Sequence, residues 1–367
     1  MKISSVEAIP VSIPYRRPFV FASGEVATAD HVIVRITTNE GIVGHAEAPP
    51  RPYTYGETQA SIVTIIRDHF GPAIVGADPF GREGIHAALA RTVGNNAARG
   101  AIDVALWDVV GQATGQPCQA LLGGAATGMR VAHMVGFAST PEMVDEAVRM
   151  RERHGITAFK VKVGRYPVER DLQMCRAIRE ALGADVEIYV DANRGWDADT
   201  AIRAGRVLVE IDVTLFEEPC PADDVLGRRR VVRESPIPIV GDESCVRLGE
   251  VARNLLDGSC NAVSVKAART GFTESSKIIG LCEGLGVTAL VGNQVDGMLG
   301  TLASVSLGSA FRSVAARPGE LSNFLLMADD VLADPPRIHD GVLEAPELPG
   351  IGARIDPEKL ARYRADR

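Results

Sequence analysis

From about residue 130 onward the chain repeats one unit, a short apolar stretch followed by a segment with helix signals. The apolar stretches end at polar residues spaced 24 to 29 residues apart, which suits one strand, one helix and two loops. Strands that alternate with helices in this way are parallel and joined by crossover helices. Seven strands are visible and an eighth is expected within 312–322, which predicts a (β/α)₈ barrel, with an open doubly wound sheet as the alternative. The polar residues at the strand ends are Lys162, Asp191, Glu217, Asp242, Lys266 and Asn293.

The first third of the chain has a different pattern. Residues 1–13 and 31–48 have the pattern of antiparallel strands, with a hairpin turn at Asn39–Gly41. The strongest helical pattern, over residues 97–115, places several apolar side chains on one face. This part is therefore α+β in character. At 367 residues the chain exceeds one ordinary domain, so we expect two domains or one large barrel with additions.

Composition and charge argue against several classes of protein. Hydrophobic residues make up 46% and charged residues 23%, which is typical of a folded globular chain. The net charge of -8 argues against nucleic-acid binding, and no apolar run approaches the ~20 residues of a membrane helix. The six cysteines are scattered without a C-x-x-C pair, and the first residues do not resemble a signal peptide. We therefore expect a cytoplasmic protein with buried free thiols.

Three consecutive predicted strands end in a carboxylate, at Asp191, Glu217 and Asp242. Barrel enzymes carry catalytic groups at these strand ends, and neighbouring strands lie about 4.8 Å apart, so the three side chains are expected to converge. Anions this close repel one another unless a cation lies among them. An all-oxygen ligand set favours Mg²⁺ or Mn²⁺ over zinc. Periodicity leaves open whether Glu217 or Glu218 points inward, because successive strand residues face opposite sides.

Lysines flank these carboxylates. Lys160 and Lys162 are two residues apart on one predicted strand and point to the same side, and Lys266 ends a strand across the barrel. We expect nearby cations and a metal to lower the pKa of Lys266, so that it exchanges protons near neutral pH. With a divalent metal the pocket is positive, which suits a small anionic substrate such as a dicarboxylate. A lysine on either face of a substrate α-carbon can move a proton to or from an enolate.

Other catalytic motifs are absent from the sequence. It contains no H-E-x-x-H, no P-loop and no G-x-S-x-G, and no G-x-G-x-x-G follows a predicted strand. The seven histidines show no metal-ligand spacing. We expect His31, His45 and His133 to be ordinary strand or loop residues.

Together these residues resemble the enolase superfamily, and within it the muconate lactonising enzyme subgroup, over nearly the whole chain. The resemblance implies that Asp191, Glu217 and Asp242 bind the metal. It also implies an α+β capping domain over 1–125, a (β/α)-barrel catalytic domain over 126–322, and a C-terminal segment, 323–367, that returns to the cap. The motifs that carry the resemblance are Lys160-Val-Lys162, Asp191-Ala-Asn193, Glu217-Glu218-Pro219, Asp242-Glu243-Ser244 and Lys266.

The resemblance also implies roles for further residues. Lys162 and Lys266 are expected to be acid-base residues, and Glu320 to have an acid-base or supporting role. The segment Glu320-Leu321-Ser322 differs from the Asp-x-Asp with which dipeptide epimerases hold a substrate ammonium group. Cap loops around Arg17–Val26 and Pro49–Tyr55 are expected to set specificity. The residues expected to contact the substrate are Lys160, Asn193, Asn293 and, from the cap loops, Phe19 and Tyr53.

The sequence therefore favours a metal-dependent cycloisomerase that converts cis,cis-muconate to muconolactone through a metal-stabilised enolate. Lys162 is expected to deliver the proton with Lys266 on the opposite face, and substrate orientation can exchange these roles. Alternatives on the same scaffold are a racemase or epimerase of an N-substituted amino acid or dipeptide, and an o-succinylbenzoate synthase-like dehydratase. A metal-stabilised binding barrel without catalysis is a further alternative. We expect a homo-oligomer with no nucleic-acid or membrane partner.

Overall fold

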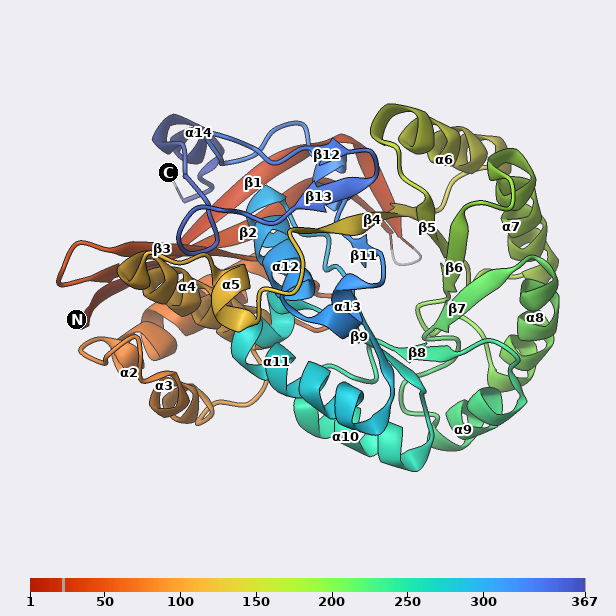
Figure 1. Cartoon of the computed structure of the whole chain (residues 1–367), viewed down its shortest axis with the longest axis horizontal. Coiled ribbons are helices and arrows are strands. Elements are labelled where there is room, and N and C mark those ends of the chain that lie inside the picture. Colours follow the sequence, from red (N-terminus) through yellow and green to blue (C-terminus); the bar gives the residue numbers. More distant parts are fainter. Residues whose placement is uncertain (22–23, 367) are drawn as a thin grey trace.

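The structure, a computed structural model, describes residues 1–21 and 24–366, with the side chains of residues 1–18 and 26–366. An antiparallel sheet with its helices lies beside a barrel of parallel strands (Figure 1). This arrangement confirms the predicted fold class, a (β/α)-type barrel with an N-terminal α+β cap. Within the described residues, no helix combines the length and the apolar character needed to cross a membrane.

The cap contains an antiparallel sheet of three strands in the order β1-β2-β3. β1 spans Ile3–Phe21, β2 spans Gly24–Thr38, and the predicted turn leads into β3, Val43–Ala48. β1 extends beyond the predicted 1–13 because it stays paired with β2 as far as Phe21. The helices that follow are α1 (Gln59–Ile65), the π-helical turn η1 (Ile66–Phe70), α2 (Gly71–Ile74), α3 (Arg82–Leu89), α4 (Asn96–Thr114) and α5 (Cys118–Leu122).

Eight parallel strands form the barrel, seven in the order β10-β9-β8-β7-β6-β5-β4 and the eighth, β11, paired with β4. β11 spans only Gly319–Glu320, inside the region 312–322 where the sequence predicts it. Because β11 also contacts β10, it closes the barrel. The other strands are β4 (Gly128–Val135), β5 (Ala158–Lys162), β6 (Glu187–Asp191), β7 (Val213–Glu217), β8 (Ile239–Gly241), β9 (Ala262–Val265) and β10 (Thr288–Val291).

Crossover helices connect the strands and cover the outside of the barrel (Figure 1). After β11 the chain forms a 3-10 turn, η2 (Asn323–Leu326), instead of an eighth barrel helix. The described barrel therefore has eight strands and seven crossover connections, and its last strand lacks the helix that would complete an eighth strand–helix unit. The helices are α6 (Thr140–His154), α7 (Val168–Leu182), α8 (Ala198–Glu210), α9 (Val225–Glu234), α10 (Leu248–Asp257), α11 (Ala267–Leu285), α12 (Met298–Ala310) and the short α13 (Arg312–Ala315).

The C-terminal segment is attached to both parts of the molecule. A hairpin of β12 (Ile338–His339) and β13 (Val342–Glu344) adds antiparallel to β4 of the barrel. Helix α14 (Pro357–Tyr363) lies against β1, and the backbone N–H of Ala365 donates to the carbonyl of Pro10. The segment therefore pairs with the barrel before it returns to the cap. We propose the bounds 1–125, 126–322 and 323–367 for the three parts.

Mostly small and branched side chains fill the barrel interior, which suits a chain with only 5% aromatic residues. Each of the strands β4 to β10 contributes one residue to this inner layer. The larger core lies between the strands and the outer helices and continues into the cap. All six cysteines are buried and free, as predicted. The inner layer consists of Ala132, Ala158, Tyr189, Leu215, Val240, Ala262 and Leu290.

Helix α4 is the main contact between cap and barrel. It packs between β3 and α11, so it is buried on opposite faces and not along one apolar face as predicted. The carboxylate of Asp103 on α4 accepts hydrogen bonds from the backbone N–H groups of Phe272 (2.6 Å) and Thr273 (2.9 Å). These groups follow the non-helical residue Gly271, whose φ is 60°. A carboxylate of the cap therefore caps the regular part of a barrel helix.

Strand β3 supplies a second contact of the same kind. Glu47 accepts hydrogen bonds from the backbone N–H groups of Gly297 (3.1 Å) and Gly300 (2.6 Å) at the N-terminus of α12. A carboxylate at a helix N-terminus satisfies free N–H groups and is favoured by the helix dipole. The cap is thus bonded to the first turns of two barrel helices.

Gly271→Ala is expected to destabilise the protein far more than Gly280→Ala, although both residues lie in α11. A Cβ at Gly271 would lie 2.4 Å from Asp103 Oδ2 at a φ of +60°, whereas a Cβ at Gly280 meets nothing within 4 Å. We expect a loss of about 2 kcal/mol for Gly271→Ala and a small gain for Gly280→Ala. Scanning calorimetry measures both as shifts in Tm, and equal Tm values would contradict the close approach of Asp103.

Candidate active site

A cavity of about 640 Å³, here called the mouth cavity, lies between the cap and the ends of the barrel strands. Its barrel side is formed by residues at or just after the ends of β4, β5, β6, β8, β9, β10 and β11. Its cap side is formed by β1, β2 and the loop between β3 and α1, which contribute Tyr15, His31, Arg51 and Tyr55. Barrel enzymes carry their catalytic groups at this end of the strands.

The predicted strand-end residues lie at this end of the barrel. Lys162, Asp191 and Glu217 are the last residues of β5, β6 and β7 and are lateral neighbours in the strand register. Asp242 and Lys266 directly follow β8 and β9. Because parallel strands end at one rim, their spacing in sequence places these charged side chains side by side.

Glu217 and Glu218 point to opposite sides of the chain at the end of β7. The Glu217 carboxylate accepts a hydrogen bond from Lys160 Nζ (2.7 Å) inside the barrel. The Glu218 carboxylate pairs with buried Arg228 and accepts a hydrogen bond from the backbone N–H of Asp242 (2.6 Å). The structure therefore places Glu217 among the inward carboxylates and Glu218 in a separate buried ion pair.

Lys160 lies among the carboxylates and is only 1% exposed. Its Nζ is 2.7 Å from Glu217, 2.7 Å from Glu320 and 3.0 Å from Asp191. Hydrogen bonds to Glu217 and Glu320 use two of its three N–H donors, and the buried ammonium group also forms an ion pair with Asp191. Burial raises the pKa of Glu217 well above its ordinary value. Burial also raises the pKa of Asp191, but the nearby charges of Lys160 and Lys162 together outweigh burial and lower this pKa to about 2.

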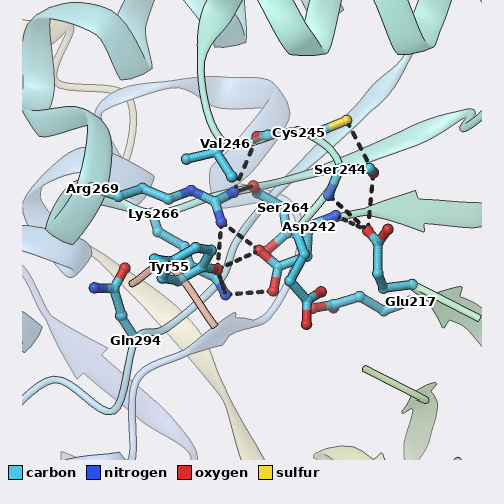
Figure 2. A network of polar contacts seen from close by, with 12 residues as sticks. Tyr55, Glu217, Asp242, Ser244, Cys245, Val246, Ser264, Lys266, Arg269 and Gln294 are labelled. Carbon is cyan, nitrogen blue, oxygen red and sulfur yellow. Dashed lines mark hydrogen bonds and ion pairs between the residues drawn. The ribbon is translucent and has the colours of Figure 1, made fainter. Parts of the chain in front are cut away.

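Lys266 forms a second group with Asp242, Arg269 and Tyr55 (Figure 2). The Asp242 carboxylate accepts hydrogen bonds from Lys266 Nζ and Arg269 Nη1, both at 2.6 Å. The Tyr55 hydroxyl accepts hydrogen bonds from Arg269 (2.6 Å) and Lys266 (3.2 Å). Burial lowers the pKa of Lys266, but Asp242 and Tyr55 together raise it above its ordinary value. The predicted lowering assumes a metal ion bound beside Lys266, so it stays a prediction.

The sequence did not identify Tyr55 or Arg269 as site residues. Arg269 lies three residues after Lys266, a spacing that brings side chains together on a helix. This spacing could have identified Arg269 from the sequence. Tyr55 belongs to the cap loop from which Tyr53 was selected. Tyr55 points to the barrel, whereas Tyr53 is 69% exposed at the cavity edge. The turn that directs them depends on backbone bonds to the carbonyl of Arg51, which residue types alone do not specify.

Phe19, the other predicted cap contact, lies in β1 and pairs through its backbone with Val26 of β2. Its side chain lies outside the described part of the chain. The predicted specificity loop Arg17–Val26 is the tip of the β1–β2 hairpin, of which residues 22 and 23 also lie outside the described residues.

Lys162 faces the mouth cavity, and β6, β7 and β8 separate its strand from that of Lys266. Its Nζ donates hydrogen bonds to Asp191 Oδ2 and to Asn193 Oδ1, both at 2.6 Å. The amide nitrogen of Asn193 donates in turn to Glu243 (3.0 Å). Asn193, predicted to contact substrate, here orients Lys162 and links it to Glu243.

Asn293 follows β10, and its side-chain amide is fully bonded within the protein. Nδ2 donates to Asp296 (3.3 Å) and to the backbone carbonyl of Glu320 (3.0 Å). Oδ1 accepts from the backbone N–H of Asp296 (2.8 Å) and from Asn323 Nδ2 (2.6 Å). These four bonds use both donors and both lone pairs of the amide. Asn293 therefore has no free group for the predicted substrate contact and instead fixes the strand that carries Glu320.

The next residue, Gln294, presents a free acceptor. Its Nε2 donates to the backbone carbonyl of Pro49 in the cap (2.7 Å), whereas its Oε1 is buried and has no hydrogen-bond partner among the described residues. Only the NH₂ end of the amide can donate to a carbonyl, so Pro49 determines which way the amide faces. Gln294 lines the mouth cavity, and a ligand with a hydrogen-bond donor can satisfy its Oε1.

The inward carboxylates fit a divalent metal ion. Within the described residues, no group of three Asp, Glu, His or Cys side chains is already arranged as a metal site, and lysine and arginine nitrogens bond to these oxygens instead. Glu217 Oε2, however, is buried without a hydrogen-bond partner. A buried carboxylate oxygen in this state is costly unless a cation or donor reaches it. The donor set of Asp191, Glu217 and Asp242 suits Mg²⁺ or Mn²⁺.

Comparison with known proteins covers both parts of the chain. The family model for the mandelate racemase/muconate lactonizing enzyme N-terminal domain matches residues 4–123, and the enolase C-terminal domain-like model matches residues 142–359. Muconate cycloisomerase 1 of Pseudomonas putida is 31% identical, with 98% of each chain covered. A muconate lactonizing enzyme from Mycobacterium smegmatis, solved with muconolactone, is 52% identical with a TM-score of 0.98, and 100% of each chain is covered. A dipeptide epimerase from Enterococcus faecalis, solved with Mg and L-Leu-L-Tyr, is 29% identical with a TM-score of 0.91, covering 96% of this chain and 99% of that chain.

Glu217→Gln and Glu218→Gln are expected to affect different properties, although the residues are adjacent. The first should weaken metal binding and the second should lower stability. Glu217→Gln changes one of the three carboxylates expected to bind the metal, so Mn²⁺ affinity should fall at least about 10-fold. A loss of this size already follows when only a residue that orients a metal ligand is changed. Glu218→Gln leaves Arg228 buried without its counter-charge and should lower stability by about 3–5 kcal/mol.

Titration calorimetry with Mn²⁺ and the Tm of each variant separate the two effects. Unchanged Mn²⁺ affinity in Glu217→Gln would show that Glu217 is no ligand. An unchanged Tm in Glu218→Gln would contradict the assignment of Glu218 to the buried ion pair.

Proposed function

The chain belongs to the mandelate racemase/muconate lactonizing enzyme family of the enolase superfamily, and on that premise we propose that it is a metal-dependent cycloisomerase that converts cis,cis-muconate to muconolactone. The observation that carries the proposal is the pair Lys162 and Lys266, which line one cavity from strands on opposite sides of the barrel. The relative that is 52% identical and was solved with muconolactone supports this substrate.

The charges around the mouth cavity suit a substrate with two negative charges. Four inward carboxylates are paired with four cations. A divalent metal ion added to this balanced set leaves two positive charges, which the two carboxylates of muconate neutralise. The carboxylates are those of Asp191, Glu217, Asp242 and Glu320, and the cations are Lys160, Lys162, Lys266 and Arg269.

The reaction needs one new C–O bond and one proton transfer. One carboxylate of muconate bonds to C4, and the electrons of the C4–C5 double bond move towards the other carboxylate. A metal ion held by Asp191, Glu217 and Asp242 would supply positive charge beside that second carboxylate. Lys162 transfers a proton from Nζ to C5, so the lactone forms without loss of any atom.

The neighbours of each lysine favour different roles. Asp191 and Asn193 hold two of the three N–H groups of Lys162, which leaves the third for the substrate. Lys266 Nζ donates hydrogen bonds to Asp242 (2.6 Å) and to the Tyr55 hydroxyl (3.2 Å), which hold its ammonium group beside the cavity. Protonated Lys266 stabilises negative charge on the opposite face of the substrate. The cycloisomerase needs no lysine to act as a base, which agrees with this charge state.

The environment of Glu320 argues against a dipeptide substrate. Glu320 occupies the segment in which dipeptide epimerases hold an ammonium group, but here it is 2% exposed and its carboxylate accepts a hydrogen bond from Lys160 (2.7 Å). A carboxylate that is already paired with a buried lysine attracts a substrate cation weakly. A muconate dianion needs no such partner.

A racemase or epimerase of an N-acylated amino acid is the second candidate, and Gln294 favours it. The unpartnered Oε1 of Gln294 can accept a hydrogen bond from an amide N–H, which an N-acyl amino acid has and the muconate dianion lacks. This reaction requires one lysine to remove a proton while the other donates one. The bonds from Lys266 Nζ to Asp242 and Tyr55 suit an electrostatic role of this lysine in the cycloisomerase.

The purified protein with Mn²⁺ should consume cis,cis-muconate, seen as loss of diene absorbance. Lys162→Ala should lower kcat by about 10²–10⁴-fold, the usual contribution of a general acid. Lys277→Ala, which removes an exposed lysine paired with Glu83 far from the cavity, is the matched control and should leave the rate unchanged. No loss of absorbance with a folded, metal-loaded protein would exclude the cycloisomerase.

The second candidate has its own signature. In deuterium oxide an epimerase introduces deuterium at the α-carbon of an N-succinyl amino acid without a change in connectivity, which proton NMR detects. The cycloisomerase proposal predicts no exchange with such substrates and one solvent deuteron at C5 of the lactone formed from muconate. Rapid α-exchange together with inertness towards muconate would select the epimerase.

A further inference from the structure

His31 is a buried histidine of the cap that lines the mouth cavity. It lies in β2, is 4% exposed and belongs to the cap side of the cavity, facing the barrel side that carries Lys162 and Lys266. Its backbone carbonyl accepts a hydrogen bond from Gln59 Nε2 (2.9 Å), which holds this part of β2 to helix α1. The proposed lactonisation does not assign any role to this residue.

The orientation of the His31 ring is set by Glu47. His31 Nδ1 donates to Glu47 Oε1, and the Glu47 carboxylate is held in turn by the backbone N–H groups of Gly297 (3.1 Å) and Gly300 (2.6 Å). Glu47 therefore bonds to the N-terminus of a barrel helix and to the ring of a cap residue at once. The ring position is thus determined by both parts of the molecule that enclose the cavity.

The second ring nitrogen of His31 has no hydrogen-bond partner within residues 1–21 and 24–366 that the structure describes. His31 itself lines the cavity. Because Nδ1 is bonded to the Glu47 carboxylate, Nε2 is the ring nitrogen that is available to a ligand in the cavity. An N–H at Nε2 is a suitable donor to a carboxylate.

We propose that His31 is a substrate-binding residue whose Nε2–H holds the carboxylate of the substrate that is remote from the metal ligands. The inference rests on the proposed function, in which that carboxylate bonds to C4 of muconate. Arg51, from the loop that follows β3, also lines the cap side and adds positive charge there. A ligand with a carboxylate at each end can then bridge the barrel residues and the cap.

Two substitutions at one position separate the two ring nitrogens. The amide of asparagine in His31→Asn occupies the place of Nδ1, so it keeps a contact with Glu47 and removes the group at Nε2. The longer glutamine in His31→Gln places its amide near Nε2 and so keeps a donor towards the cavity. His45→Asn, on the neighbouring strand β3 and away from the cavity, is the control for the loss of a cap histidine.

The experiment measures binding, so it does not depend on turnover. Titration calorimetry of the full chain with saturating Mg²⁺ compares adipate, a six-carbon dicarboxylate, with hexanoate, which lacks the second carboxylate. We expect His31→Asn to weaken adipate binding at least about 10-fold and to leave hexanoate unchanged, because one charge-assisted hydrogen bond is lost. His31→Gln should retain most of the adipate affinity, and His45→Asn should bind both acids like wild type.

Every other result overturns the inference. Adipate affinity that His31→Asn leaves unchanged, an equal loss for hexanoate, or wild-type protein that binds the two acids alike would each show that His31 does not bind the second carboxylate. Muconate turnover is recorded separately for wild type. If the adipate pattern appears without turnover, the proposed cycloisomerase fails while the role of His31 in binding dicarboxylates stands.

Discussion

The rest of the site depends on one interaction, the pairing of carboxylates buried at the open end of the barrel with lysine and arginine side chains. Strands β6, β7 and β11 end in carboxylates at one rim and Asp242 follows β8, and repulsion between such groups is strong where water is excluded. Two lysines of β5, the lysine that directly follows β9 and an arginine of α11 contact them at 2.6 to 3.0 Å. The cations that stabilise this cluster are also the groups available for chemistry. A divalent ion would change the balance to positive and favour a dianion, in a protein whose net charge is -8.

The cap completes this charge balance and does more than cover it. Its Tyr55 hydroxyl donates to Asp242 and accepts from the cations that pair with that carboxylate. Its Asp103 and Glu47 bond to the N-termini of the regular part of α11 and of α12, the helices that follow β9 and β10. The elements that carry Lys266 and Asn293 are therefore the ones to which the cap is bonded. Side chains such as His31 consequently keep a defined position relative to the barrel residues across the cavity.

Much of the fold and the inward carboxylates could be predicted because they depend on periodicity. A strand end recurs every 24 to 29 residues, and parallel strands end at one rim, so Asp191, Glu217 and Asp242 had to lie near one another. Periodicity could not decide between Glu217 and Glu218, and it did not show that the chain after β11 leaves without a barrel helix. It also did not show that the Asn293 side-chain amide is fully bonded inside the protein or that Lys160 bonds to Glu217 and Glu320, since their partners are up to 160 residues away.

The sequence by itself determined the barrel, the α+β character of the first third and the set of charged residues at the strand ends, because these follow from local patterns of apolar and polar residues. The capping role of the first third was implied by the resemblance to the enolase superfamily. Only the tertiary structure decided the state of each residue in that set. The Asp242 carboxylate and the Tyr55 hydroxyl lie 2.6 and 3.2 Å from Lys266 Nζ and together raise the pKa of Lys266 against the effect of burial. Likewise Tyr55, and not Tyr53, reaches the barrel because of the backbone turn that directs it. Charge states and free hydrogen-bonding groups depend on distances between residues remote in sequence, and those distances exist only once the chain has folded.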